Sequence, residues 1–279
     1  MKFVLLPTDF SENSLNAISY ALELYSEEEC TFKLLYCYKV NDYQEESRLT
    51  PIPAPEKLKA AHIQAERRLK QLGDQLSQKE KGQFHFQHIS ENKNLVTAIR
   101  EQITLIHPEL IVIGTQGHTG DTEVVYGSNT VNIMEEIVRC PVLAVPANAR
   151  FKGISEIVLA NSYKIELNTN DLNYLLQLTA RFKAAIRVLH IMEEGGLNRS
   201  QHENKQALKE RLKSSNHSFH SLEFLNIPLG IYSFTESRGS EMIAFINKKH
   251  TFFENMLFSP VYKNLAHYSK VPVLVLHQP

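Results

Sequence analysis

Three glycines at fixed offsets are the residues of this chain best suited to hold a ligand. The sequence has only 11 glycines in 279 residues, yet Gly114, Gly117 and Gly127 fall between a strand pattern and a helix pattern. Glycine lets a ligand approach the main chain closely because it has no side chain. The natural ligand for such backbone is a phosphate chain, although any one of these glycines alone would indicate an ordinary tight turn.

The segments around the glycines favour an anion site. Residues 110–113 (LIVI) predict a short buried strand, after which the chain must turn. Residues 127–130 (GSNT) open a helical pattern that continues over residues 131–138, and Ser128 is predicted to be its N-cap. The unpaired N–H groups at the start of a helix attract anions, and the Ser128 and Thr130 hydroxyls would add donors.

Composition excludes several classes of partner. With 43% hydrophobic residues and a net charge of −1, the chain can bury a core but has no electrostatic bias toward nucleic acid or anionic membranes. Cys30, Cys37 and Cys140 are odd in number and lack metal-ligand spacing, which indicates a reducing compartment. Pro7 interrupts the first apolar run too early for a signal peptide, and no apolar stretch approaches membrane-spanning length. We therefore expect a cytoplasmic protein.

Apolar runs alternate with helical patterns in the order βαβαβαβαβ. The expected elements are a strand at Lys2–Leu6, a helix over Leu15–Leu24, a strand at Phe32–Tyr38, a loop at Asn41–Pro55, a helix at Glu56–Leu76, a strand at Gln83–Ile89, a helix at Leu95–Ile106, the strand and helix described above, and a strand at Val142–Val145. This order implies a mostly parallel five-stranded sheet with helices on both faces. Ligands bind at the carboxyl ends of the strands in such sheets.

The same plan begins again after a connector at residues 147–153. Residues 157–159 (IVL) resemble residues 4–6 (VLL), and residues 271–275 (VPVLV) repeat residues 140–144 (CPVLA). The chain is therefore predicted to be an internal duplication. We expect an α/β protein of two tandem doubly wound (Rossmann-like) domains, at residues 1–147 and 152–279.

The second copy differs at the glycine positions. An ungapped count back from Pro272 places Phe245, Lys248 and Phe258 where the first copy has its three glycines, and Ser162 stands in the place of Asp9. Bulky side chains at these positions would exclude a phosphate chain. The second domain is thus expected to keep the fold and to lack this nucleotide site, while a different ligand there stays open.

The glycine pattern resembles the ATP-binding signature of universal stress proteins. Gly-x2-Gly-x9-Gly-Ser is preceded by Leu-Ile-Val-Ile and closed by Cys-Pro-Val-Leu-Ala-Val-Pro, and residues 4–14 (VLLPTDFSENS) are similar to that family's first strand and turn. The resemblance covers the first half fully and the second half by general layout. It therefore implies a tandem two-domain member of the family.

The resemblance also implies a binding site. The residues it assigns are Pro7, Thr8, Asp9 and the backbone of Cys37 around the adenosine, Gly114, Gly117, Gly127, Ser128 and Thr130 around the phosphates, and Gln116 and Asn129 beside them. The implied ligand is ATP, ADP or AMP. Family sites often hold Mg²⁺ as well, but no carboxylate cluster in this sequence specifies a protein metal ligand. Asp9 by itself is equally well explained as a turn former, and Lys93 stands where the family commonly has a glycine.

Catalytic signatures are missing from the sequence. The Walker pattern G-x-x-x-x-G-K-[ST] is absent, as are G-x-S-x-G and Cys-His signatures, so we predict no catalytic residue and at most slow hydrolysis. The expected role is nucleotide-dependent sensing or signalling in a stress response, with output through protein partners that the sequence does not name. A slow nucleotide hydrolase and a nucleotide-free interaction scaffold are the alternatives.

Pairing of the last strands is a further expectation. Members of the family commonly dimerise through these strands. In a tandem chain, residues 142–144 and 273–275 can pair within one molecule and so protect two exposed edges, which gives an intrachain pseudo-dimer. Further pairing of two chains into a homodimer is left open.

Overall fold

The described residues form a single sheet that runs through both halves of the chain. The computed structural model describes residues 2–39, 55–79, 84–115, 127–192, 195–223, 226–247 and 271–277. The strands are β1 (Lys2–Pro7), β2 (Cys30–Cys37), β3 (His85–Glu91), β4 (Leu110–Gly114), β5 (Val142–Val145), β6 (Glu156–Ala160), β7 (Ala185–Met192), β8 (His217–Glu223), β9 (Met242–Asn247) and β10 (Val273–His277). The helices are α1 (Glu12–Leu24), α2 (Pro55–Lys79), α3 (Leu95–Ile106), α4 (Ser128–Glu136), α5 (Thr169–Phe182), α6 (Arg199–Leu212) and α7 (Ile227–Arg238).

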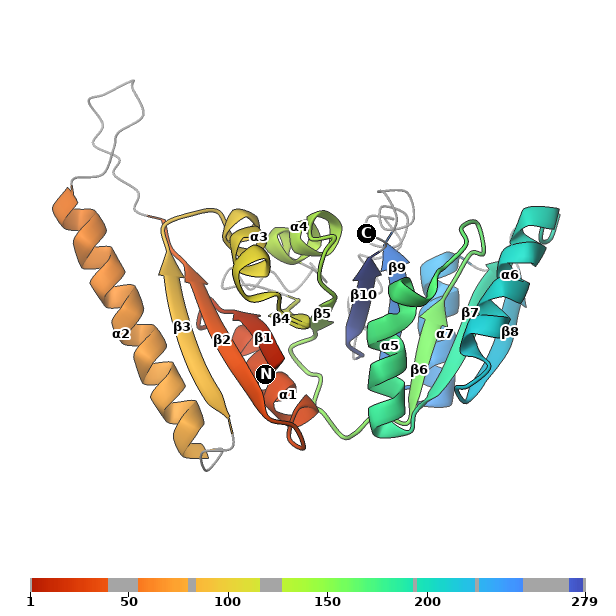
Figure 1. Ribbon diagram of the computed structural model, residues 1–279, viewed down its shortest axis with the longest axis horizontal. Coiled ribbons are helices and arrows are strands. Elements are labelled where there is room, and N and C mark those ends of the chain that lie inside the picture. The colour runs from red at the N-terminus through yellow and green to blue at the C-terminus, as the bar shows by residue number, and fades with distance from the viewer. Residues whose placement is uncertain are drawn as a thin grey trace, which may run out of the picture.

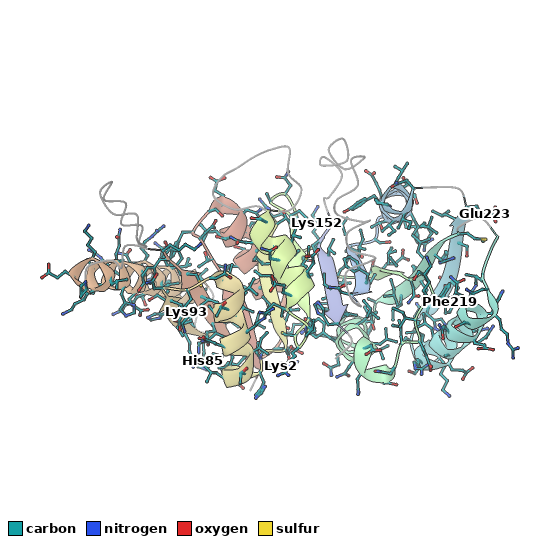
Figure 2. The ribbon with its side chains drawn as sticks, turned by 90° about the horizontal axis from the view of Figure 1, so that it is seen from above. Lys2, His85, Lys93, Lys152, Phe219 and Glu223 are labelled. Carbon is teal, nitrogen blue, oxygen red and sulfur yellow. The ribbon has the colours of Figure 1, made fainter. Side chains whose placement is uncertain are left out.

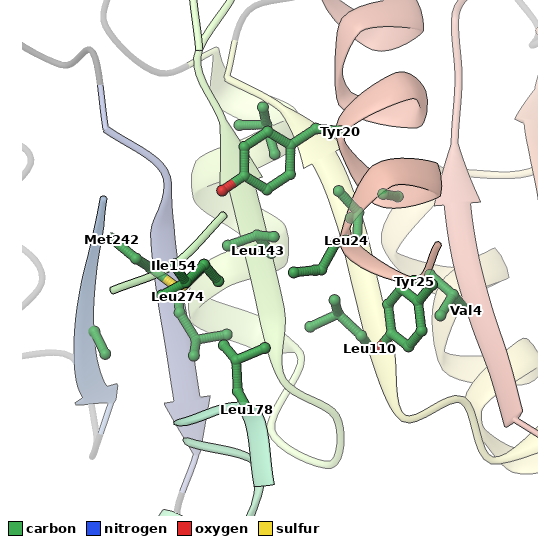
Figure 3. Close-up of a cluster of buried hydrophobic side chains, with 14 of the residues drawn as sticks. Val4, Tyr20, Leu24, Tyr25, Leu110, Leu143, Ile154, Leu178, Met242 and Leu274 are labelled. Atoms are coloured by element: carbon green, nitrogen blue, oxygen red, sulfur yellow. The ribbon is translucent and has the colours of Figure 1, made fainter. Parts of the chain in front are cut away.

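The strand order confirms the predicted fold class. The sheet has the order β3-β2-β1-β4-β5-β10-β9-β6-β7-β8, so each half contributes five strands in the same doubly wound arrangement (Figure 1). Every strand pair within a half is parallel. The predicted pairing of the last strands is also present, because β5 and β10 pair antiparallel with Leu143 opposite Leu274. These two leucines lie on adjacent strands in the core between the halves (Figure 3).

Helices cover both faces of this sheet. Buried side chains of α1, α2, α5 and α6 form one core with the strands, and those of α3, α4 and α7 form a second core on the opposite face. Both cores continue across the seam between β5 and β10, which makes the two halves one packed body. In the described ranges, no helix combines the length and the apolar character needed to span a bilayer.

Local sequence signals set most of the element ends. Helix α3 spans the predicted residues because Asn94 caps its first turn by accepting a hydrogen bond from Val96 N, and because His107 ends it in a left-handed conformation (φ 44°) before Pro108. Helix α2 extends beyond its predicted bounds at both ends. Strand β3 begins and ends two residues later than predicted. Most of the predicted loop at residues 41–55 lies outside the described residues.

Backbone details repeat between the halves. After β1, Phe10 has a φ of 64°, and after β6 Tyr163 has a φ of 56°. In both turns the residue two positions earlier, Thr8 or Asn161, accepts a hydrogen bond from that backbone N–H through its side chain. A left-handed non-glycine residue is uncommon, so the shared turn supports the predicted duplication.

The ladders correct the predicted alignment of the halves. Val4 pairs with Leu110 in the first half, and its counterpart Ile157 pairs with Met242 in the second. Counting along β4 and β9 from these pairs makes Ile246, rather than Phe245, the equivalent of Gly114 in the second half. The ungapped count was wrong by one residue at this strand, and the counterparts predicted for the other two glycines, Lys248 and Phe258, lie outside the described residues.

Candidate functional site

A cavity of about 300 Å³ lies at the carboxyl ends of β1, β2 and β4. It is lined by Pro7, Thr8, Asp9, Ser14, Cys37, Lys39, Lys93, Asn94, Leu95, Ile113, Gly114, Gly127, Ser128, Asn129 and Thr130. The structure thus brings together nine of the eleven residues that the sequence proposed for a ligand site. The other two, Gln116 and Gly117, lie outside the described residues.

The turn after β1 forms one wall of the cavity. Asp9 Oδ1 accepts hydrogen bonds from Ser11 N (3.0 Å) and Ser11 Oγ (2.5 Å), which is the turn-forming role that its residue type also indicated. The buried Thr8 hydroxyl lies 3.0 Å from Ser14 Oγ. Ser14 was not predicted, and its position three residues after the N-cap Ser11 was the signal that could have found it. These bonds fix the turn before any ligand binds.

Gly114 is required for a reason that the sequence did not indicate. A Cβ at this position would lie 2.6 Å from Oδ1 and 2.9 Å from Cγ of Asn13, and 3.1 Å from the Asn13 backbone carbon. The missing side chain therefore makes room for helix α1, which packs against β4. The sequence analysis explained the missing side chain by the close approach of a phosphate. At Gly114 it is instead explained by the close approach of helix α1 to strand β4.

Helix α4 begins at the cavity, but its N-cap is Gly127 and not Ser128. Gly127 has the extended backbone of an N-cap without a side chain to bond the first turn, so Ser128 is the first helical residue and is exposed. The buried Thr130 hydroxyl donates its hydrogen bond to Gly114 O (2.8 Å). Thr130 therefore holds α4 to β4, whereas the exposed Ser128 is placed to offer a donor to a ligand.

A second helix also points its N-terminus at the cavity. Asn94 and Leu95, the N-cap and first residue of α3, line it together with Lys39 and Lys93. Lys93 Nζ lies 2.6 Å from Glu101 Oε2 and 3.5 Å from Glu91 Oε2, and its side chain is exposed on the first half of the molecule (Figure 2). Two helix N-termini and Lys39 make this end of the cavity favourable for an anion, whereas the charge of Lys93 is already paired with Glu101 and Glu91.

Three of these lining residues carried signals in the sequence. Asn94 and Leu95 open a helix that was predicted correctly, and the N-terminus of a helix that follows a parallel strand lies at the ligand-binding edge. Lys39 follows Cys37 by two residues, as expected for neighbours on one side of an extended segment. Ile113 was predicted as part of a strand, without a role in the site.

Cys37 lines the cavity as an inert thiol. It is half-buried, and burial together with the Glu91 carboxylate raises the pKa of its thiol to about 12. The thiol stays protonated at neutral pH and is a poor nucleophile. Its contribution to the site is therefore through shape and backbone.

Known proteins match this chain at the level of family and fold. The model of the universal stress protein family matches residues 1–146. None of the curated proteins matches the sequence.

Solved structures match over nearly the whole chain. A universal stress protein from Archaeoglobus fulgidus DSM 4304 superposes with a TM-score of 0.68 at 15% identity, over 99% of this chain and 96% of that chain. A putative universal stress protein from Pseudomonas aeruginosa UCBPP-PA14 gives a TM-score of 0.59 at 14% identity, over 99% and 93%. The cytoplasmic domain of a prokaryotic cation chloride cotransporter gives 0.52 at 13% identity, over 99% and 95%. At these identities the likeness shows the fold alone, and that fold serves more than one kind of protein.

Proposed function

The chain belongs to the universal stress protein family, and from this premise we propose that the cavity at β1, β2 and β4 binds ATP or a related adenine nucleotide. The observation that carries the proposal is the meeting, in one cavity, of two helix N-termini with three strand ends. Residues about 120 positions apart, Thr8 and Ser128, both line it.

The phosphate end of the proposed site is at α4. The first N–H groups of a helix have no partner within the helix and carry partial positive charge. Gly127, Ser128 and Asn129 present these groups to the cavity, and Lys39 and Lys93 lie on the same cavity. This arrangement fits a polyphosphate and would disfavour a cationic ligand.

The adenosine end is assigned to Pro7, Thr8, Asp9 and Cys37. Pro7 and Thr8 are buried and Asp9 is half-buried, so they form a fixed wall with one carboxylate. Asp9 is the only acidic residue among the lining residues that the structure describes. One carboxylate does not make a Mg²⁺ cage, and we assign any Mg²⁺ to the phosphate oxygens instead.

The second half has a different role in this proposal. We divide the chain into nucleotide-binding residues 1–147 and a second copy at 152–279 without the same site. Ile246 replaces Gly114, and its partly buried side chain packs against the hydrophobic core. Output would then pass to protein partners in a stress response. Free thiols at Cys30, Cys37 and Cys140 fit action in the reducing cytoplasm.

Titration calorimetry with ATP and Mg²⁺ tests the site through Ser128→Asp. A carboxylate at the first helical position favours the helix itself, but it repels a triphosphate. We expect the affinity for ATP to fall at least about tenfold. Thr169→Asp is the matched control, because it puts the same charge at the first position of α5 in the second half, and it should leave the affinity unchanged.

Two results would overturn the proposed site. Absence of binding heat with the wild type would favour the nucleotide-free scaffold, and equal affinity in wild type and Ser128→Asp would place the nucleotide elsewhere. A phosphate-release assay on the same samples addresses the hydrolase alternative. Turnover that disappears with Ser128→Asp would show that the site is catalytic.

A further inference from the structure

The second half caps the far end of the helix that begins at the cavity. Met134 O, in the last turn of α4, accepts hydrogen bonds from Asn247 Nδ2 (3.1 Å) and His277 Nε2 (3.0 Å). The last four carbonyls of a helix lack partners within it. In α4 the Met134 carbonyl is one of these four, and two side chains more than 100 residues away in the sequence serve as its partners.

Strand register explains why both donors reach the same carbonyl. Asn247 is the last residue of β9 and His277 the last of β10, and the two are paired in the ladder. Each is only 8% exposed. A carbonyl oxygen can only accept, so His277 must carry its proton on Nε2. Burial lowers the pKa of His277, which keeps the ring neutral at pH 7.

The two ends of α4 are thus held by different parts of the molecule. At its start, Thr130 Oγ1 bonds Gly114 O of the first half. One turn later, near its end, Met134 O accepts its hydrogen bonds from Asn247 and His277 of the second half. A helix of nine residues is too short to be stable alone, so its position depends on these attachments and on its buried face.

We propose that Asn247 and His277 are positioning residues for the ligand site of the first half. By fixing the C-terminal end of α4, they fix the direction in which its N-terminal N–H groups point into the cavity. The second half then acts on nucleotide affinity without binding nucleotide itself. This inference rests on the proposed function of the cavity.

Two apolar variants, Asn247→Leu and His277→Leu, remove one donor each in the full chain. Hydrogen exchange of the α4 amides, measured without ligand, is expected to become about tenfold faster. Calorimetry is expected to show about three- to tenfold weaker ATP binding. His277→Gln retains a donor near the place of Nε2 and should restore both values toward the wild type.

His190→Leu is the matched control. His190 is also a buried histidine of the second half, and its Nδ1 lies 2.9 Å from the backbone oxygen of Asn161, within that half. Its loss should lower global stability without changing α4 exchange or ATP affinity. Equal effects from His190→Leu and His277→Leu would reduce the role of His277 to general stability and overturn the inference.

The two readouts separate this inference from the proposed function. Unchanged α4 exchange in both leucine variants, or faster exchange with unchanged ATP affinity, would overturn the positioning role. A wild type that gives no heat with ATP would instead defeat the proposed function. In that case faster α4 exchange would still support the attachment of α4 to the second half.

Discussion

Replacement of Gly114 by alanine is expected to lower the free energy of unfolding by about 2 to 3 kcal/mol. The new Cβ would lie within 3.0 Å of two side-chain atoms of Asn13, so that buried side chain must shift, and the Asn13 backbone carbon at 3.1 Å requires α1 to give way slightly as well. Gly114 and Asn13 are both buried, and relaxation there disturbs the packing of α1 against β4. Chemical denaturation followed by circular dichroism measures the change.

A second substitution separates this clash from other effects. Asn13→Ala removes two of the three closest atoms, and the Asn13 amide has no hydrogen-bond partner among the described residues. The double variant should therefore recover part of the lost stability. Gly73→Ala is the control, since its Cβ would meet its nearest atoms at 3.8 and 3.9 Å, and it should be neutral or slightly stabilising. Wild-type stability of Gly114→Ala would refute the packing explanation.

Glu156→Gln is expected to remove about 3 kcal/mol of stability at neutral pH. Glu156 lies at the start of β6, where Arg238 donates to both carboxylate oxygens (2.6 and 2.8 Å), Arg187 to Oε2 (2.6 Å) and Ser240 to Oε1 (2.7 Å). Its side chain is only 13% exposed, so these bonds are little screened by solvent. They hold the pKa of Glu156 at about 2, with the Arg238 hydrogen bond as the largest cause.

The sign of this shift fixes the pH dependence. Because the pKa is lower in the folded than in the unfolded protein, the carboxylate stabilises the fold above about pH 4.5, and this stabilisation is lost as the pH falls toward 2. The difference in unfolding free energy between wild type and Glu156→Gln should shrink across that window. Exposed Glu210, at 76% side-chain exposure, serves as the control, and Glu210→Gln should change stability little. A pH-independent difference for Glu156→Gln would contradict the ionic origin of the effect.

Local patterns in the sequence were sufficient for the fold class, and the family resemblance supplied most of the predicted residues that line the cavity. Residues 95–106 and 142–145 form the predicted helix and strand because the capping Asn94, the left-handed stop at His107 and a short apolar run are local signals. The glycine pattern named Gly127, and the resemblance to universal stress proteins named Thr8 and Cys37. All three line one cavity, at the edge of the sheet where the carboxyl ends of the parallel strands meet. Pairing of the last strands was expected because members of the family commonly dimerise through them, and the structure shows that β5 and β10 pair antiparallel within the chain.

Only the tertiary structure decided which atoms the key residues contact. The strand pairing showed that Ile246 is the equivalent of Gly114 in the second half. The count along the sequence missed this because an insertion of one residue leaves no mark in the hydrophobic pattern. The need for a glycine at 114 arises from Asn13, and the end of α4 is held by Asn247 and His277. Such contacts join segments about 100 residues or more apart, and their geometry depends on how helices settle on the sheet, which residue types alone do not specify.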